Sequence, residues 1–407
     1  MAYYRRNLYV LSATIFLTCV SWNQIIPFLP LFMRDLNVAP NELLDWVGII
    51  FALQSGASIV ALPFWGKLGD KYGRKPMAVR AGFCLGMIYL GMSVCSTPFQ
   101  LAILRFLNGA LTGFIPSSMA LIATNTPEDK APRYIAIAQT ASAAGLIIGP
   151  LIGVGLASWV GYRHSMHISG AAVLLCTLLV LVVVKEQNKA TISEETGLLQ
   201  DFVISLSSRV LSSVMLTVMV YGIYVAGVTP ILSLYVPQLG GRAPYWMSGF
   251  VFSLLPLAFM STAYLWSCLG RTIGYDTIIK WGLMGSAACG VLLAYIHNVW
   301  VFSVIFFFAG VFLAALNPAT GAIICTKIGE HFRGRAYGMQ SSANMIGSLI
   351  APLIAARVGR EFGLPAVFAF VGITAFVGLI IFALLRLGWS DDRWEPVGNE
   401  IPNNESS

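Results

Sequence analysis

Charge is what this sequence of 407 residues lacks most: Asp, Glu, Lys and Arg together make up 11% of it. Soluble domains average about a quarter of such residues, so a water-soluble globular protein is excluded. The 25 Lys and Arg residues are spread over many short segments and form no single basic face. That distribution argues against nucleic acid as a partner.

Motifs that carry chemistry are missing as well. The seven cysteines lie inside apolar runs, with no CxxC or Cys/His cluster, so we expect neither a metal site nor a disulfide. The phosphate-binding pattern GxxxxGKS/T is absent, which argues against ATP hydrolysis. No nucleophile–base arrangement is evident. The sequence therefore predicts no enzymatic activity and no bound cofactor.

Long apolar runs are what the chain has instead. Apolar residues make up 57% of the sequence, and nearly uncharged segments long enough to cross a hydrocarbon core of ~30 Å recur along it. Each must be a helix, because an open strand edge is unsatisfied in lipid. The predicted fold is an all-α polytopic membrane protein. Its twelve transmembrane helices are expected at about residues 8–33, 44–65, 77–97, 99–124, 134–158, 164–184, 210–236, 245–268, 277–297, 299–325, 336–357 and 364–386.

A polar stretch at residues 186–209 divides the chain in its middle. It separates an N-terminal six-helix bundle (1–185) from a C-terminal one (210–390), and a polar tail (391–407) follows. Most Lys and Arg residues fall on the side of the termini, which predicts that both termini are cytoplasmic.

The two halves also repeat each other in sequence. Two pseudo-symmetric bundles that enter the membrane from the same side are typical of secondary transporters, whose binding cavity lies between the bundles. The corresponding positions are Pro116, Arg133, Gly145 and Pro150 in the first half, and Pro318, Arg335, Gly347 and Pro352 in the second.

A basic, glycine-rich turn joins the second and third predicted spans. It contains Gly66, Asp70, Gly73 and Arg74, and glycine suits positions where the backbone must turn tightly or where a neighbour must approach. A weaker copy in the second half has Arg271 where the first half has Asp70.

In this position, Gly66-x-Leu68-x-Asp70-x-x-Gly73-Arg74-Lys75 resembles the loop signature of the major facilitator superfamily. The spans, the repeat and the central linker extend the resemblance over nearly the whole chain. It implies that Asp70 and Arg74 form a latch against the second half, near the eleventh helix, that holds the cytoplasmic side shut. Glu128 or Asp129 is a further possible partner.

The fifth predicted span carries Gly145, Gly149, Pro150 and Gly153. Glycines four residues apart share one helix face and permit close packing, and the proline permits a kink. This pattern resembles the fifth-helix signature of the family's antiporters, which implies export. Ordinary small-residue packing is the alternative interpretation.

Arg105 places a charge within the fourth span. Inserting a charged side chain into the membrane at the centre of a helix costs ~2.5–3.5 kcal/mol. It resembles the family arginine implicated in proton coupling, although its long side chain could instead extend to the interface. No Asp or Glu lies deep in any span, unlike in many proton-driven relatives. Asp70 and Asp35, with Asp45, are therefore the nearest acidic candidates for proton coupling. The absence also favours neutral, zwitterionic or anionic substrates over strictly cationic ones.

A few polar and aromatic side chains within the spans are candidates for the substrate cavity, since such groups suit an amphipathic ligand. Each could equally form a helix–helix hydrogen bond. The candidates are Asn23, Gln24, Tyr221, Tyr224, Asn317 and Asn344.

The resemblance extends to the twelve-helix drug–proton antiporter group. It implies a monomeric secondary exporter in the bacterial cytoplasmic membrane. The exporter would move drug-like or amphipathic small molecules outward in exchange for protons, by alternating access and without a cofactor. Two alternatives remain: a lipid or glycolipid flippase of the same fold, and a proton-coupled metabolite importer. The partners expected are the small-molecule substrate, protons and the lipid bilayer.

Overall fold

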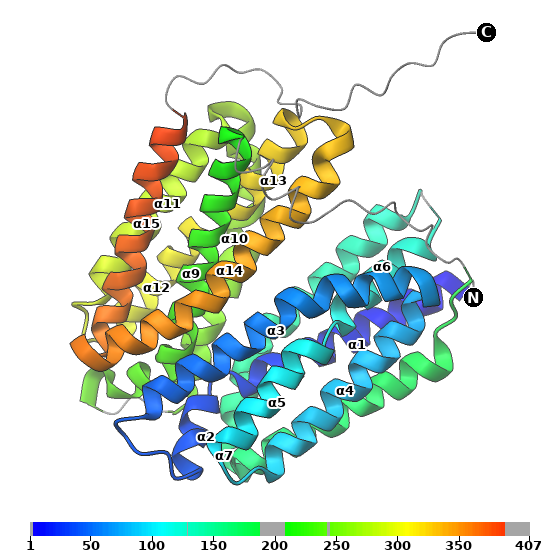
Figure 1. The fold of residues 1–407 in the computed structure, drawn as a ribbon, viewed down its shortest axis with the longest axis horizontal. Coiled ribbons are helices and arrows are strands. Elements are labelled where there is room, and N and C mark those ends of the chain that lie inside the picture. Colours follow the sequence, from blue (N-terminus) through cyan, green and yellow to red (C-terminus); the bar gives the residue numbers. More distant parts are fainter. Residues whose placement is uncertain (1–2, 128, 188–207, 242–244, 387–407) are drawn as a thin grey trace.

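The computed structural model describes residues 3–127, 129–187, 208–241 and 245–386 (Figure 1). Within these ranges every long element is a helix, and eleven helices are long and apolar enough to cross a membrane. One of them, α7 (Ala131–Val183), has 53 residues and contains Gly161 in a non-helical conformation, with φ 82° and ψ 164°. Its contour of ~80 Å is enough for two spans, so α7 comprises the fifth and sixth predicted helices. The twelve-helix prediction is confirmed.

The first half is built from seven helical elements. The first and fourth predicted spans are each interrupted, whereas the sequence predicts them unbroken. The first breaks between Ile25 and Leu29, around Pro27, and the fourth at Gly113, whose φ of 128° only glycine adopts readily. The bounds are α1 Tyr3–Ile25, α2 Leu29–Asp35, α3 Leu43–Tyr72, α4 Arg74–Val94, α5 Pro98–Leu111, α6 Phe114–Thr124 and α7 Ala131–Val183.

The second half repeats this arrangement. Its fourth span is also interrupted, between Leu313 and Leu316, although no glycine stands at the break. The bounds are α9 Arg209–Tyr235, η1 Val236–Gly241, α10 Tyr245–Ile273, α11 Tyr275–Leu293, α12 Val299–Leu313, α13 Leu316–Lys327, α14 Glu330–Phe362 and α15 Leu364–Arg386.

The internal repeat is visible in local geometry. The helix-ending glycines Gly161 and Gly363 correspond, with φ of 82° and 88°. An equivalent indole hydrogen bond occurs in both halves: Trp65 Nε1 donates to the Ala110 carbonyl and Trp266 Nε1 to the Val311 carbonyl, each at 2.7 Å. The two bundles are therefore copies of one six-helix unit.

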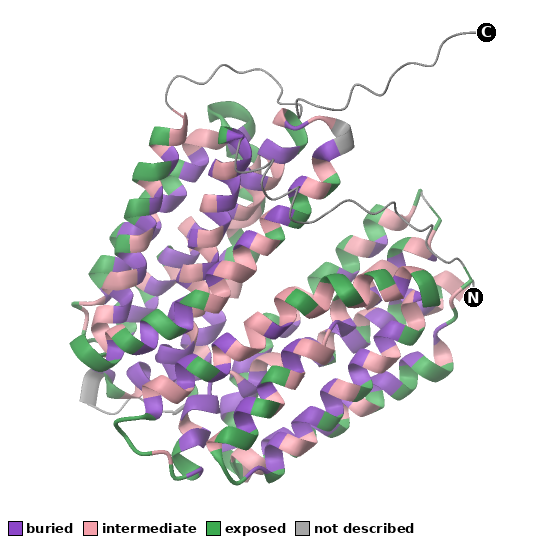
Figure 2. Cartoon of the chain, in the orientation of Figure 1, coloured by how far each residue is buried: buried purple, intermediate pink, exposed green. Residues whose placement is uncertain are grey.

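Exposed residues run along the outer faces of both bundles (Figure 2). Many of them are large and apolar, as are the residues of the cores. Phe302, Phe306 and Phe368 are fully buried in the second half, where Phe302 packs edge-on against Phe368 with ring centroids 5.2 Å apart. Trp159 and Tyr264, in contrast, are 84% and 76% exposed. Large apolar residues exposed in this number indicate a surface that faces lipid.

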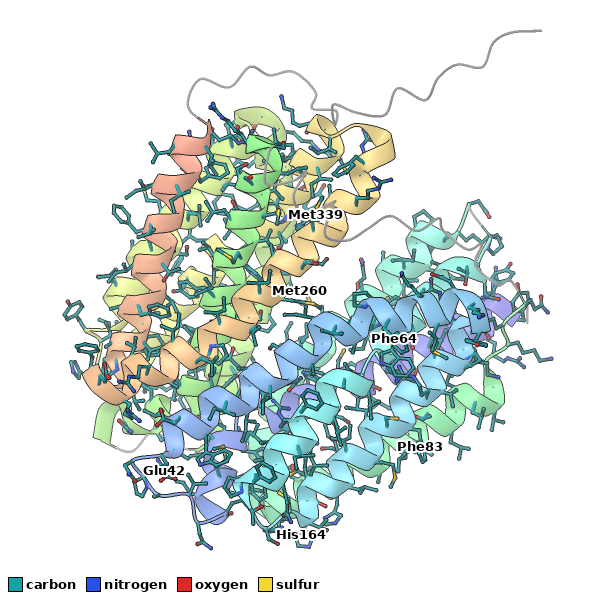
Figure 3. The ribbon with its side chains drawn as sticks, in the orientation of Figure 1. Glu42, Phe64, Phe83, His164, Met260 and Met339 are labelled. Atoms are coloured by element: carbon teal, nitrogen blue, oxygen red, sulfur yellow. The ribbon has the colours of Figure 1, made fainter. Side chains whose placement is uncertain are left out.

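The two halves meet at one end of the molecule and diverge toward the other (Figure 1). We call the end where α1 begins and α15 ends the terminal end, and the opposite one the distal end. Glu42, beside the start of α3, lies at the distal end, whereas Phe64 of α3 and Met339 of α14 lie on the diverging parts (Figure 3).

Candidate functional site

The glycine-rich turn lies at the terminal end, where α3 passes into α4. Gly73 ends α3 with φ 106° and ψ 154°, and its N–H donates to the Gly69 carbonyl at 3.0 Å. The second half has the same turn: Gly274 has φ 89° and ψ 138°, and its N–H donates to the Gly270 carbonyl at 3.0 Å. The weaker sequence copy is therefore a close geometric copy.

Asp70 and Arg74 form an ion pair across one turn of this segment, with 28% and 20% of their side chains exposed. Glu186, just after α7, accepts hydrogen bonds from the backbone N–H of Arg74 at 2.7 Å and of Lys75 at 3.0 Å. A carboxylate at this place accepts hydrogen bonds from free N–H groups in the first turn of α4. Its negative charge also interacts favourably with the positive end of the helix dipole. A Cβ built on Gly73 would lie 2.8 Å from Glu186 Oε2, so the Glu186 side chain would have to shift, and the positive φ of Gly73 is what requires glycine here.

Glu186 was not identified from the sequence. It lies 112 residues from Arg74 in a segment that reads as the start of a linker. The only signal is its position as the first acidic residue after the sixth apolar run. Neighbouring bonds hold this segment in place: Asn7 Nδ2 donates to the Lys185 carbonyl at 2.6 Å, and the Gln187 N–H donates to Asn125 Oδ1 at 2.7 Å.

The described partners of Asp70 and Arg74 all lie in the first half. The halves are apart here, because Cβ atoms built on Gly66 of α3 and on Gly334 and Gly338 of α14 would meet nothing within 4 Å. The predicted contact with the eleventh helix therefore stays a prediction for another conformation. Of the further partners, Glu128 lies outside the described residues, and Asp129 Oδ2 lies 3.8 Å from Lys130 Nζ.

The signature glycines of α7 pack directly on α1. A Cβ on Gly149 would lie 2.8 Å from Asn23 Cβ, and one on Gly153 would overlap the carbonyl oxygen of Gln24. Gly145 approaches Cys19 in the same way, at 2.5 Å. These glycines form one face along which two helices touch through their backbones.

Pro150 of this signature faces the second half instead. A Cβ on Gly249 of α10 would lie 2.7 Å from the Pro150 carbonyl oxygen. One turn along, Ser253 Oγ donates to the Ile147 carbonyl at 2.5 Å. The fifth-helix signature therefore joins three helices: its glycines contact α1, and its proline region contacts α10.

Arg105 lies within the first bundle and is only 3% exposed. Its guanidinium carbon lies 5.1 Å from the ring centroid of Phe51 on α3, and no described residue accepts a hydrogen bond from its Nε. Asn108, one turn further along α5, is fully buried as well. Buried, unpartnered polar groups are costly, and such burial does not fit a side chain that extends to the interface.

The cavity candidates lie in both halves and differ in burial. Gln24 and Tyr224 are buried, 3% and 1% exposed, in the interiors of opposite halves. The Gln24 amide points toward the Ser165 carbonyl at 3.5 Å. The half-buried candidates are Asn23, Tyr221, Asn317 and Asn344.

The acidic candidates lie at the helix ends. Asp35 is exposed at the end of α2, at the distal end of the molecule. Asp45, in the first turn of α3, forms an ion pair with Arg360 of α14 and so connects the two halves.

Comparison with known proteins agrees with this architecture. The family model described as Major Facilitator Superfamily matches residues 11–296 and 247–404. The chain belongs to the major facilitator superfamily. It is therefore a multi-pass membrane transporter for small molecules and not an enzyme.

Within this superfamily, the chain is similar to two bacterial proteins named multidrug resistance protein MdtG. The protein from Proteus mirabilis is 32% identical over 382 residues, which cover 93% of this chain and 95% of the relative. The protein from Serratia proteamaculans is 33% identical over 392 residues, which cover 95% and 94%.

Two solved structures share the fold. A bacterial homologue of the human lysosomal transporter Spinster, in an inward-facing and occupied conformation, has a TM-score of 0.83 at 12% identity, covering 97% of this chain and 99% of that one. The human organic anion transporter MFSD10 has a TM-score of 0.66 at 17% identity, covering 94% and 100%.

Proposed function

We propose that this transporter exports drug-like or amphipathic small molecules across the bacterial inner membrane in exchange for protons, by alternating access. The relatives named multidrug resistance proteins match the chain along more than nine-tenths of its length. The glycine and proline pattern of α7 supports the same direction of transport, because it resembles the fifth-helix signature of the family's antiporters.

The observation that carries the proposal is the one-sided contact between the bundles. Toward the distal end, α3 packs on α14 and α7 packs on α10, with Gly48 and Gly249 against neighbouring backbone. At the terminal end, Gly66 and Gly338 face open space. If one bundle rocked on the other as a rigid body, the terminal end would close and the distal end would open.

With both termini in the cytoplasm, this arrangement would correspond to the inward-open state of the proposed cycle. The Asp45–Arg360 ion pair then closes the periplasmic side, while Asp70 and Arg74 are free of the second half. In the outward-open state, Asp70 and Arg74 would contact the second half near α14. Each state would thus have an ionic contact of its own, as a two-state equilibrium requires.

Asp70 and Arg105 are the residues through which we propose that transport is coupled to protons. Asp70 would change surroundings between the two states, because its partner set would change. Arg105 would act from inside the first bundle, where its buried guanidinium would stabilise a negative charge nearby. The lack of acidic residues deep in the spans favours neutral, zwitterionic or anionic substrates.

Proton release in proteoliposomes tests the proposal. Purified protein is reconstituted with a pH-sensitive dye inside the vesicles, a pH gradient is imposed, and neutral aromatic drugs are added. We expect drug-dependent proton flux in the wild type and its loss in Asp70→Asn. No flux with any drug would refute the proposal. Flux on adding lipid head groups would favour a flippase, and flux on adding polar metabolites would favour an importer.

A further inference from the structure

The halves are joined along two seams that the repeat makes equivalent. The first seam is the contact of α3 with α14, where a Cβ on Gly48 would lie 2.9 Å from the Pro352 carbonyl oxygen. The second seam is the contact of α7 with α10, where Gly249 meets the Pro150 carbonyl at 2.7 Å. In each seam a glycine of one half rests on the proline carbonyl of the other.

The seams differ toward the distal end. In the first seam the Asp45–Arg360 ion pair follows the glycine contact and bridges the halves. The equivalent positions in the second seam hold Trp246 and Ser158, which cannot form an ion pair. Ser158 Oγ instead donates to the Gly155 carbonyl of its own helix at 2.7 Å.

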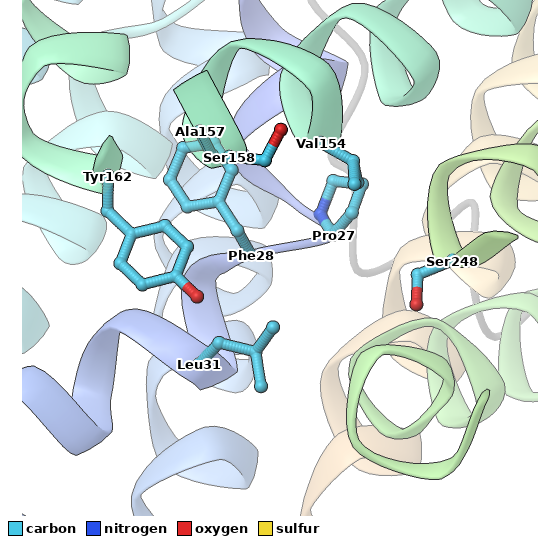
Figure 4. Close-up of a pocket in the computed structure, with 8 residues that line it drawn as sticks. All are labelled: Pro27, Phe28, Leu31, Val154, Ala157, Ser158, Tyr162 and Ser248. Atoms are coloured by element: carbon cyan, nitrogen blue, oxygen red, sulfur yellow. The ribbon is translucent and has the colours of Figure 1, made fainter. Parts of the chain in front are cut away.

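A cavity of about 310 Å³ occupies this part of the second seam (Figure 4). The break between α1 and α2 lies at its wall, where Pro27 and Phe28 face residues of α7. Its lining comes from both halves of the protein. The lining residues are Pro27, Phe28, Leu31, Val154, Ala157, Ser158, Tyr162 and Ser248.

The chemistry of the lining selects a ligand class. One wall is aromatic: the Phe28 and Tyr162 rings are stacked, with centroids 5.4 Å apart and planes 26° from parallel. Among the residues that the structure describes, no charged side chain lines the cavity, and the polar groups of its lining side chains are the hydroxyls of Ser158, Tyr162 and Ser248. Apolar walls with a few hydroxyl groups are typical of sites for small organic ligands, which start at roughly 300 Å³.

We propose that this seam cavity is a binding site for uncharged aromatic compounds, at the distal end and apart from the space between the halves at the terminal end. A ring would stack beside Phe28 and Tyr162, and the serine hydroxyls would bond its polar substituent. The proposal concerns binding, and it stands whether or not transport is coupled to protons.

The test is binding of the uncharged dye N-phenyl-1-naphthylamine, whose fluorescence rises in an apolar site, to the purified full-length protein. Ser158→Trp fills the cavity from a partly exposed position. Ser96→Trp is the matched control, because Ser96 is exposed in the α4–α5 loop and lines no cavity described here. We expect the wild type and Ser96→Trp to bind alike, and Ser158→Trp to bind about tenfold or more weakly. Equal binding by all three proteins, or no binding by the wild type, would overturn the proposal.

A second measurement does not depend on how well the tryptophan variant folds. Ser158→Cys introduces a thiol at the cavity wall, and its alkylation by N-ethylmaleimide is followed with the dye present and absent. Cys268 and Cys325, which are exposed, are replaced by serine beforehand. Protection of the new thiol by the dye supports the site, and an unchanged rate refutes it. Proton flux plays no part in either readout, so failure of the transport proposal would be seen separately.

Discussion

Breaking the Asp45–Arg360 ion pair should shift the balance between the two conformations. The pair is the ionic bridge described between the halves at the distal end, and its side chains are 37% and 40% exposed. Pairs this exposed contribute ~0.2–1 kcal/mol. Because 1.4 kcal/mol is a factor of ten, Arg360→Gln should raise the outward-open fraction, relative to the inward-open one, by at most about fivefold.

The shift can be measured by double electron–electron resonance between spin labels at the terminal end. Lys71→Cys on α3 and Gly338→Cys on α14 place the labels on the parts that diverge here, with exposed Cys268 and Cys325 replaced by serine. We expect a larger short-distance population in the Arg360→Gln background. The difference should shrink near 1 M salt, where the Debye length is ~3 Å.

Arg357→Gln is the matched control. Arg357 lies on the same helix but pairs with Glu361 of that helix, its Nε 2.6 Å from Glu361 Oε1. Its loss should leave the distance distribution unchanged. Asp45→Asn should act like Arg360→Gln, and the double variant should add little to either one. Identical distributions for the Arg360→Gln and Arg357→Gln proteins would refute the bridging role of the pair.

Three further outcomes are expected. Gly153→Ala should sharply reduce the yield of folded protein, because its Cβ would overlap the Gln24 carbonyl; Gly155→Ala, with nothing within 4 Å, should have no such effect in size-exclusion chromatography. Glu186→Gln should lower the free energy of unfolding by ~0.5–2 kcal/mol by weakening the cap of α4, seen as a lower Tm, and an unchanged Tm would count against the cap. Arg105→Ala should abolish drug-dependent proton flux in proteoliposomes while Arg105→Lys retains part of it, and full activity of the alanine variant would remove Arg105 from the mechanism.

Features of the fold that depend on local chemistry were predictable from the sequence. Uninterrupted apolar runs mark the spans, because lipid permits only helices. Gly73 and Gly274 mark the turns, because their positive φ angles are costly for other residues. The break between α12 and α13 was not predictable in the same way, since no glycine marks it and the surrounding packing decides it.

The candidate site was predictable only in part. Asp70 and Arg74 are one helical turn apart, so their ion pair follows from spacing. Glu186 approaches the same turn only because the sixth span returns to the terminal end. This contact depends on tertiary packing and does not follow from local sequence. The burial of Gln24 and Tyr224 likewise depends on how helices rotate about their axes, which nearly uniform apolar sequences do not specify.

The α3 helix connects the two ends of the molecule. It has 30 residues and therefore spans ~45 Å, with Asp45 in its first turn and Asp70 in its last turns. Here Asp45 is paired across the halves while Asp70 is paired within its own half. Partly exposed pairs of this kind are individually weak. That weakness suits the proposed cycle, because a bridge worth several kcal/mol at either end would hold the bundles in one state and leave the other unpopulated.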